Sequence, residues 1–334
     1  MDTVTQIVLG SAIAEAGFRK KLGAKAVVFG GVCGLLPDLD IITRLQGTWQ
    51  YLQHHRGISH SIFFLTLLTP IMGYLGYRYL GKKTYFLTWL WLAFLALVTH
   101  PILDLFTSYG TQLLFPLTSQ KLAIDAISIM DPIYTLLLFC SLFIGCLKIF
   151  SYDFRRNFAI AMLFLSTSYI GFGYLQSQKA ISLAQRQLLS ENRSIAKIRV
   201  TPSLFNIFVW RIIAQDNQEN FQIGIVSTLN PRPIVFCSVI KEKHPLVIEA
   251  LDTEKGKIFQ NFSMGLLSAR VESNSEGYRV YLLDMRYGLV NDPSQNVFGA
   301  VFDFDKNGSF RDASRLARPY IRIQDELKAI WESL

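Results

Sequence analysis

The stretch of sequence that decides the fold is YFLTWLWLAFLALVTHPILDLF, at residues 85–106. It is long enough for a helix that crosses the hydrocarbon core of a bilayer, which takes about 20 residues. It has no polar face of the kind that a soluble amphipathic helix shows. His100 and Asp104 are four residues apart near its end, so their side chains lie on one face of the expected helix. The segment therefore predicts a membrane helix that carries two metal-competent side chains.

Further apolar segments surround this helix in the sequence. Three are of similar length, at residues 58–80, 133–150 and 158–175. Two shorter ones, at residues 4–18 and 24–36, are rich in Gly and Ala, and small residues let helices approach closely in lipid. We expect these two to form a hairpin that spans or re-enters the membrane. The pattern predicts an all-α polytopic membrane domain of about six membrane segments, the first two a short hairpin.

Composition excludes several classes of protein. The chain has 334 residues, of which 51% are hydrophobic and 17% are charged, which excludes intrinsic disorder. Four cysteines are too few for a disulfide scaffold. The formal net charge is +8, but no basic cluster is interleaved with aromatic residues, so we expect no nucleic-acid partner.

The positions of the basic residues predict the orientation in the membrane. One alternating set of loops carries most of them: Arg19, Lys20, Lys21, Lys25, Arg78, Lys82, Lys83, Lys148, Arg155 and Arg156. The other set holds Arg44, Arg56 and Lys121. By the positive-inside rule the first set is cytoplasmic. We therefore expect a multi-pass protein of the cytoplasmic (inner) membrane, with the loops at 37–57 and 107–131 on the extracytoplasmic side.

The sequence changes character after residue 175. Residues 1–175 form the expected membrane domain, and residues 176–200 are polar and indicate a helical linker. Residues 201–334 contain alternating runs such as FQIGIVSTL and YRVYLLDM, separated by turn signals. We expect this last part to be a soluble α+β domain on the extracytoplasmic side.

Histidines and acids gather on that same predicted side of the membrane half. The set consists of His54, His55, His60, His100, Asp38, Asp40, Asp104, Asp125 and Asp131. A carboxylate at the centre of a membrane helix costs at least about 2.5 kcal/mol, so such groups usually mark a function or a bound ion. The gathering of these side chains on one side predicts a metal site.

The types and spacings of these residues indicate the chemistry. Mixed imidazole and carboxylate ligands favour zinc, or another first-row divalent ion such as manganese, over calcium. We expect one or two ions, bound by Asp38, Asp40, His60, His100 and Asp104. Such an ion activates water and stabilises a developing oxyanion. Arg56 is placed to hold an anionic group, and His55 or a spare carboxylate such as Asp131 is placed to move a proton.

Several of these residues have a structural alternative. His54 is as readily explained as a histidine at the membrane interface. Asp131, directly before Pro132, is equally an N-terminal cap of a helix. Asp125 has the alternative interpretation of a solvated acid in a loop. Ser108 is interpreted as a residue that orients a metal ligand.

Five blocks of this sequence carry a resemblance to a known family, and the tail TPSLFNIFVWRI at 201–212 resembles its extended branch. The blocks are MDTVTQIVLGSAIAEA at 1–16, GLLPDLD at 34–40, HHRGISHSIFF at 54–64, THPILDLFTSYGTQLLFPL at 99–117 and IDAISIMDPIYTL at 124–136. With them the chain resembles the LexA-regulated, membrane-bound metal-dependent hydrolases of bacteria, in an extended branch with a C-terminal α+β domain. That family is in turn distantly similar to zinc-dependent phospholipases C and single-strand nucleases.

The resemblance implies roles for particular residues. It implies metal or catalytic roles for Asp38, Asp40, His55, Arg56, His60, His100 and Asp104, with Ser108, Gly110 and Asp131 as further motif positions. This chain departs from the family at Gln6, where many relatives have a histidine, so we expect no strong ligand there.

Two functional hypotheses follow. The first is a membrane-bound hydrolase in which metal-activated water attacks an ester, a phosphate ester by preference, of a lipid or another anionic, membrane-proximal substrate. The second is a non-enzymatic, ion-conducting or metal-sensing membrane protein whose extracytoplasmic domain binds a partner. Transporters place polar groups at mid-membrane on broken helices, whereas here these groups cluster at helix ends, which favours the hydrolase.

Overall fold

The computed structural model describes residues 1–81, 85–317 and 322–334. The chain divides into two compact units, Met1–Gly173 and Tyr174–Leu334. The first unit is helical. Its elements are α1 (Thr3–Gly17), α2 (Arg19–Leu22), α3 (Lys25–Leu35), the 3₁₀ helix η1 (Leu36–Gln46), α4 (Thr48–His54), the 3₁₀ turn η2 (Ile58–His60), α5 (Ile62–Leu75), the π-helical turn η3 (Gly76–Leu80), α6 (Phe86–Leu105), α7 (Pro132–Cys146) and the first part of α8 (Tyr152–Ser190).

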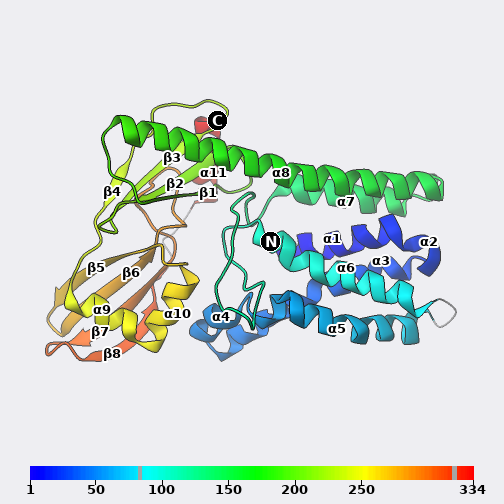
Figure 1. Cartoon of the computed structure of the whole chain (residues 1–334), viewed down its shortest axis with the longest axis horizontal. Helices are drawn as coiled ribbons and strands as arrows, with labels where there is room; N and C mark the ends of the chain where they lie inside the picture. Colours follow the sequence, from blue (N-terminus) through cyan, green and yellow to red (C-terminus); the bar gives the residue numbers. More distant parts are fainter. Residues whose placement is uncertain (82–84, 318–321) are drawn as a thin grey trace. The chain divides into compact units, whose positions relative to one another are not determined.

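Helices α1 and α3 lie side by side with their backbones in contact (Figure 1). A Cβ atom added to Gly10 would lie 2.2 Å from the carbonyl oxygen of Gly30, and one added to Gly34 would lie 2.4 Å from that of Gln6. Only glycine permits such an approach, as in the close helix pairs of membrane proteins. This close pairing agrees with the expected hairpin, and it brings Gln6 and Gly34 next to the end of α6.

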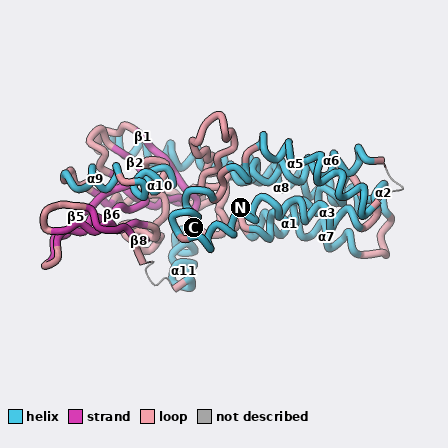
Figure 2. Tube along the Cα trace, turned by 90° about the horizontal axis from the view of Figure 1, so that it is seen from below, coloured by secondary structure: helices cyan, strands magenta, loops and turns pink. Residues whose placement is uncertain are grey.

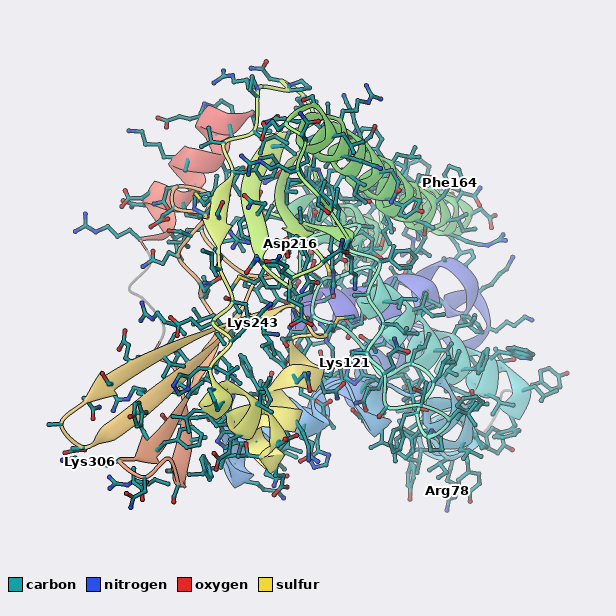
Figure 3. The ribbon with its side chains drawn as sticks, turned by 60° about the vertical axis from the view of Figure 1, so that its left-hand side comes forward. Arg78, Lys121, Phe164, Asp216, Lys243 and Lys306 are labelled. Atoms are coloured by element: carbon teal, nitrogen blue, oxygen red, sulfur yellow. The ribbon has the colours of Figure 1, made fainter. Side chains whose placement is uncertain are left out.

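The interior of the first unit is apolar and so is its surface. α6 packs against α1, α3 and α5, and Trp89 of α6 meets Phe29 of α3 edge-on with 5.1 Å between ring centroids. Phe164 of α8, labelled in Figure 3, is 71% exposed. An apolar surface over an apolar core is what a helical unit in lipid requires.

Three helices of the described residues are long and apolar enough to cross a membrane. They are Lys25–Gln46 (α3 continued by η1), Phe86–Leu105 and Tyr152–Ser190. A fourth span results if the bent pair Thr48–His60 and Ile62–Leu80, which turns by 62°, is counted as one. The expectation of about six spans is therefore not supported.

The helix boundaries explain the lower count. α1 and α7 have 15 residues each, fewer than the roughly 20 that a span needs. Residues 37–46, expected in an outer loop, instead continue α3 as a 3₁₀ helix. Apolar length along the sequence does not reveal where a helix ends or bends.

The second unit is an α+β fold built on two antiparallel sheets, in line with the expected C-terminal α+β domain (Figures 1 and 2). One sheet has the order β1-β2-β3-β4 and the other β5-β6-β7-β8. The strands are β1 (Lys197–Pro202), β2 (Val209–Gln215), β3 (Phe221–Ser227), β4 (Cys237–Val239), β5 (Leu267–Asn274), β6 (Gly277–Asp284), β7 (Gly299–Asp305) and β8 (Phe310–Arg315). The helices of this unit, besides the end of α8, are α9 (Pro245–Asp252), α10 (Glu254–Phe262) and α11 (Ile323–Ser333).

Buried polar contacts join the two sheets. Arg211 of β2 donates from Nε to the carbonyl oxygen of Met285 at 3.0 Å, and Thr201 of β1 donates to that of Arg286 at 3.1 Å. The end of α8 is fixed within this unit by Gln187, whose amide both donates to and accepts from the backbone of Ile234. The expected linker at 176–200 is thus largely the last turns of α8.

Candidate metal centre

Four buried side chains converge at one end of the first unit. They are Asp38 of η1, His60 of η2, and His100 and Asp104 of α6. Each offers one ligand atom, and these atoms all lie within 4.8 Å of one another. Three segments far apart in the sequence therefore supply one group of two imidazoles and two carboxylates.

Both histidines of this group direct Nε2 towards its centre. The two Nε2 atoms are 3.1 Å apart. His100 Nδ1 lies 2.6 Å from the carbonyl oxygen of Gly34, so it must carry the proton and donate it. Ser59 donates its hydroxyl proton to Asp40 at 2.7 Å, which leaves its oxygen to accept from His60 Nδ1 at 2.9 Å. Both rings thus keep an Nε2 lone pair for an ion, the arrangement of metal-binding histidines.

Each carboxylate of the group likewise keeps one oxygen for the centre. Asp38 Oδ1 lies 3.6 Å from His60 Nε2 and 3.5 Å from His100 Nε2, while its Oδ2 accepts a hydrogen bond from Thr3 at 2.9 Å. Asp104 Oδ2 lies 3.3 Å from His60 Nε2 and 3.1 Å from Arg56 Nε. Two carboxylate oxygens and two imidazole nitrogens gathered in one buried place form a donor set that fits a divalent ion.

Further contacts to Asp104 come from the N-terminal segment. Gln6 donates from Nε2 to Asp104 Oδ1 at 3.0 Å and to the carbonyl oxygen of His100 at 3.2 Å. The amino group of Met1 forms a buried ion pair with the same carboxylate. Gln6, expected not to be a strong ligand, acts here as a hydrogen-bond donor that orients a ligand.

Asp40 stands outside the group of four, so its expected role as a ligand stays a prediction. Its Oδ1 lies 2.7 Å from His55 Nδ1, and its Oδ2 accepts from the backbone N–H of Arg56 at 2.9 Å as well as from Ser59. Residues two apart point to different sides of a helix, so Asp38 and Asp40 of η1 approach His60 from different directions. Asp40 therefore supports His55 and His60 from behind.

Arg56 lies directly beside the group. Its Nε is 3.1 Å from Asp104 Oδ2, its Nη1 donates to Thr107 at 2.9 Å, and its guanidinium lies 4.8 Å from the ring centroid of Tyr109. Its backbone is left-handed, with φ of 59°. Such strain in a residue other than glycine is typical of functional sites, and here it turns the side chain towards the cluster.

The loop between α6 and α7 covers this arrangement and contributes a residue that sequence analysis missed. Lys121, labelled in Figure 3, is buried, and its Nζ lies 3.4 Å from the carbonyl oxygen of His55 and 5.1 Å from the Tyr109 centroid. The backbone N–H of Gln112 donates to the carbonyl oxygen of Arg56 at 2.9 Å. The sequence contained a signal for Lys121, because a basic residue is uncommon on the predicted outer loops.

Other candidate residues are placed elsewhere. Asp131 caps α7 by accepting from the backbone N–H groups of Ile133 at 3.1 Å and Tyr134 at 3.0 Å, and it accepts from the Tyr169 hydroxyl at 3.0 Å. Its position supports the capping alternative rather than a catalytic role. His54 is exposed at the end of α4, whereas Ser108 and Asp125 are buried in the α6–α7 loop.

Comparison with known proteins agrees with the membrane assignment. A protein of Bacillus subtilis (strain 168), YfhP, described only as uncharacterized, is 27% identical over 307 residues, which cover 86% of this chain and 87% of that protein. No solved structure matches the chain. The model of the YdjM inner membrane protein family matches residues 1–180, which contain the whole group of four and its neighbours. The chain therefore belongs to the YdjM inner membrane protein family, the LexA-regulated family that its motifs resemble.

Proposed function

We propose that this protein is a membrane-bound metal-dependent hydrolase that cleaves an ester, a phosphate ester by preference, of a lipid or a membrane-proximal anionic substrate. The observation that carries the proposal is the pair of Nε2 atoms that face two buried carboxylate oxygens in the group of Asp38, His60, His100 and Asp104. Because Nδ1 of each ring faces an oxygen, the two Nε2 atoms can act as acceptors beside the two carboxylate oxygens, which gives the four lone pairs that a metal ion requires.

Zinc is the ion that this donor set favours, with manganese as the second choice, because imidazole and carboxylate ligands occur together in such sites. When bound, the ion lowers the pKa of a water ligand and stabilises negative charge that develops on the substrate. The group of four accounts for one ion. A second ion would need ligands from its surroundings.

The protein groups around the ion divide the remaining tasks. Asp40 fixes the ring of His55, which is also stacked on Tyr51 with 4.6 Å between centroids, so His55 is held ready to accept or donate a proton. Arg56 is a fixed planar cation next to Asp104 and suits a phosphate oxygen. Burial of the group excludes bulk water and strengthens these electrostatic interactions.

We further propose that the site lies on the extracytoplasmic side, on the ground of the basic loops. Lys82 and Lys83, which are among the basic residues of the predicted cytoplasmic loops, lie outside the described residues. Reporter fusions after Leu52, Lys83 and Arg193 are expected to read outside, inside and outside. A cytoplasmic signal at Leu52 would reverse the sidedness without affecting the chemistry.

Metal analysis tests the site directly. The purified wild type is compared with the double variant His100→Ala and Asp104→Ala, and with Asp153→Ala, an exposed acid outside the group, as the control. We expect bound metal in the wild type and the control and a loss in the double variant. Equal metal content in all three would refute the metal site.

Turnover tests the enzyme. Phosphodiesters and phospholipids are offered to the wild type with Zn²⁺ or Mn²⁺, and we expect hydrolysis that depends on His60 and His100. A protein that binds metal, hydrolyses nothing under either ion and supports an ion flux in liposomes that depends on His60 would instead be the ion-conducting alternative.

A further inference from the structure

The 3₁₀ helix η1 has two different faces beside the candidate metal centre. Asp38 is buried and faces the group of four. Leu39, Ile41, Ile42 and Leu45 of the same helix are 51%, 50%, 65% and 86% exposed. We call these four residues the apolar collar. A ligand-bearing helix with so much exposed apolar surface is not suited to water.

The depth of η1 supports contact with lipid. α3 and η1 together form the candidate span Lys25–Gln46 of 22 residues. At about 1.5 Å per residue in α3 and about 2 Å in η1, Asp38 lies roughly 20 Å from Lys25 along the helix. The hydrocarbon core is about 30 Å thick, so Asp38 falls inside it when Lys25 stands at one boundary. By the same rises, Leu39 and Ile42 lie roughly 23 and 29 Å from Lys25, within the outer part of the acyl chains, and Leu45 at roughly 35 Å reaches the headgroup level.

Neighbouring segments continue the apolar surface. Ile58 of η2, two residues before His60, is 52% exposed, and Leu117 of the α6–α7 loop is 76% exposed. These residues belong to the segments that carry or cover the group of four. Exposed apolar side chains are therefore not confined to η1.

A basic residue within the collar fits the phosphate of a lipid. Arg44 is exposed, and its guanidinium lies 4.8 Å from the ring centroid of Tyr51, which precedes His55 by one helical turn. A long basic side chain next to apolar residues places its charge at the headgroup level while its stem stays in the apolar layer. Charge and apolar surface together match a phospholipid rather than a soluble phosphate ester.

We propose that the apolar collar is embedded in the bilayer and that the substrate of the site is a membrane phospholipid, which reaches the metal centre from the leaflet and not from water. The substrate part rests on the proposed hydrolase function, whereas the embedding does not. Hydrolysis forms a bond between the oxygen of water and phosphorus, and it breaks the phosphorus–oxygen bond to the leaving alcohol. The alcohol takes up a proton, so no redox partner is needed.

The embedding is tested without any activity. Ile42→Cys is labelled with a nitroxide in full-length protein whose native cysteines are replaced by alanine, and the protein is placed in phospholipid nanodiscs. Relaxation by oxygen, which concentrates in lipid, should exceed relaxation by a water-soluble nickel complex. Ser119→Cys, exposed in the α6–α7 loop, and Phe164→Cys, exposed on α8, provide the aqueous and lipid references. A label at residue 42 that responds mainly to nickel, or to neither reagent because another part of the chain covers it, would overturn the proposal.

The substrate class is tested with Ile42→Ser plus Leu45→Ser. The rates on phosphatidylglycerol vesicles and on bis(p-nitrophenyl) phosphate are measured, and the ratio of the first to the second should fall about tenfold or more, because apolar contacts serve only the lipid. Phe164→Ser should leave this ratio unchanged. Absence of turnover on both substrates by the wild type would refute the hydrolase but not the embedding. Turnover of the soluble ester with an unchanged ratio would refute the lipid substrate while the hydrolase stands.

Discussion

The Nε2 atoms of His60 and His100 lie 3.1 Å apart, while Nδ1 of each ring already faces an oxygen acceptor. Two neutral imidazoles cannot both present lone pairs at this distance unless a proton or an ion lies between them. Two carboxylate oxygens face the same place, so a divalent cation satisfies all four atoms at once.

Removal of the metal should therefore destabilise the membrane unit. Without an ion, the facing carboxylates and imidazoles repel one another in a buried environment. We expect EDTA to lower the melting temperature of the detergent-solubilised wild type, followed by tryptophan fluorescence, and added Zn²⁺ to restore it. The variant His60→Ala plus Asp104→Ala should show no response to EDTA. An equal EDTA response in both proteins would mean that the chelator acts elsewhere.

Asp38 and Asp40 should differ when each is changed to asparagine. Asp38→Asn removes a ligand and should abolish stoichiometric metal binding. Asp40→Asn removes a carboxylate that orients His55 and His60, and such changes typically lower metal affinity by about 10–100-fold without removing the site. Metal stoichiometry at saturating Zn²⁺ and the dissociation constant distinguish the two effects. Loss of stoichiometry in Asp40→Asn would restore Asp40 to the ligands.

Gly10→Ala should be strongly destabilising. A Cβ at this position would lie 2.2 Å from the carbonyl oxygen of Gly30, so α1 and α3 must separate. Overpacking of this kind costs about 1–3 kcal/mol. Gly171→Ala in α8 is the matched control, since nothing lies within 4 Å of its added Cβ. Thermal melting should show a clear decrease for Gly10→Ala and none for Gly171→Ala, and equal melting temperatures would contradict the backbone contact.

The C-terminal unit should lose stability as the pH rises through the titration of Glu326. Burial raises the pKa of this carboxyl above its ordinary value, although one oxygen accepts from the backbone N–H of Val290 at 2.7 Å. The folded state thus favours the protonated form, and it must carry a buried charge at higher pH.

Substitution by glutamine isolates this effect. Glu326→Gln keeps an acceptor for Val290 but cannot ionise, so its melting temperature relative to wild type should be higher at about pH 8 than at about pH 5. Asp325→Asn, at the exposed neighbouring position, should show no such difference. If the melting temperatures of Glu326→Gln and wild type differ by the same amount at both pH values, ionisation of Glu326 is excluded as the cause.

The group of four was largely predictable from sequence. His100 and Asp104 are close in the sequence, and Asp38 and His60 each lie in a short motif. His100 and Asp104 share a face of any α-helix, and their meeting with Asp38 and His60 was expected from the one-sided gathering of such residues. The sequence did not separate the position of Asp40 from that of Asp38, since it did not predict that the Asp-Leu-Asp stretch lies in a helix, where residues two apart point to different sides. Asp131 was ambiguous because an aspartate before proline suits a helix cap as well as a site.

The membrane segments were harder to predict than the ligands. Apolar length identified α6 and the apolar part of α8, but the ends of α1 and α7 and the 3₁₀ continuation of α3 depend on tertiary contacts. Lys121 was counted only as a loop charge, because its burial against Tyr109 depends on residues that meet only in the folded chain.

The contact between Gly34 and His100 also bears on biogenesis. Gly34 touches the backbone of α1 and offers its carbonyl oxygen to His100, while the ligands themselves come from η1, η2 and α6. In a chain made from the N-terminus, Asp38 and His60 precede α6, so the group lacks two of its four side chains until His100 and Asp104 have been added. An ion held by all four side chains would therefore have to bind after α6 is in place, late in the maturation of the protein.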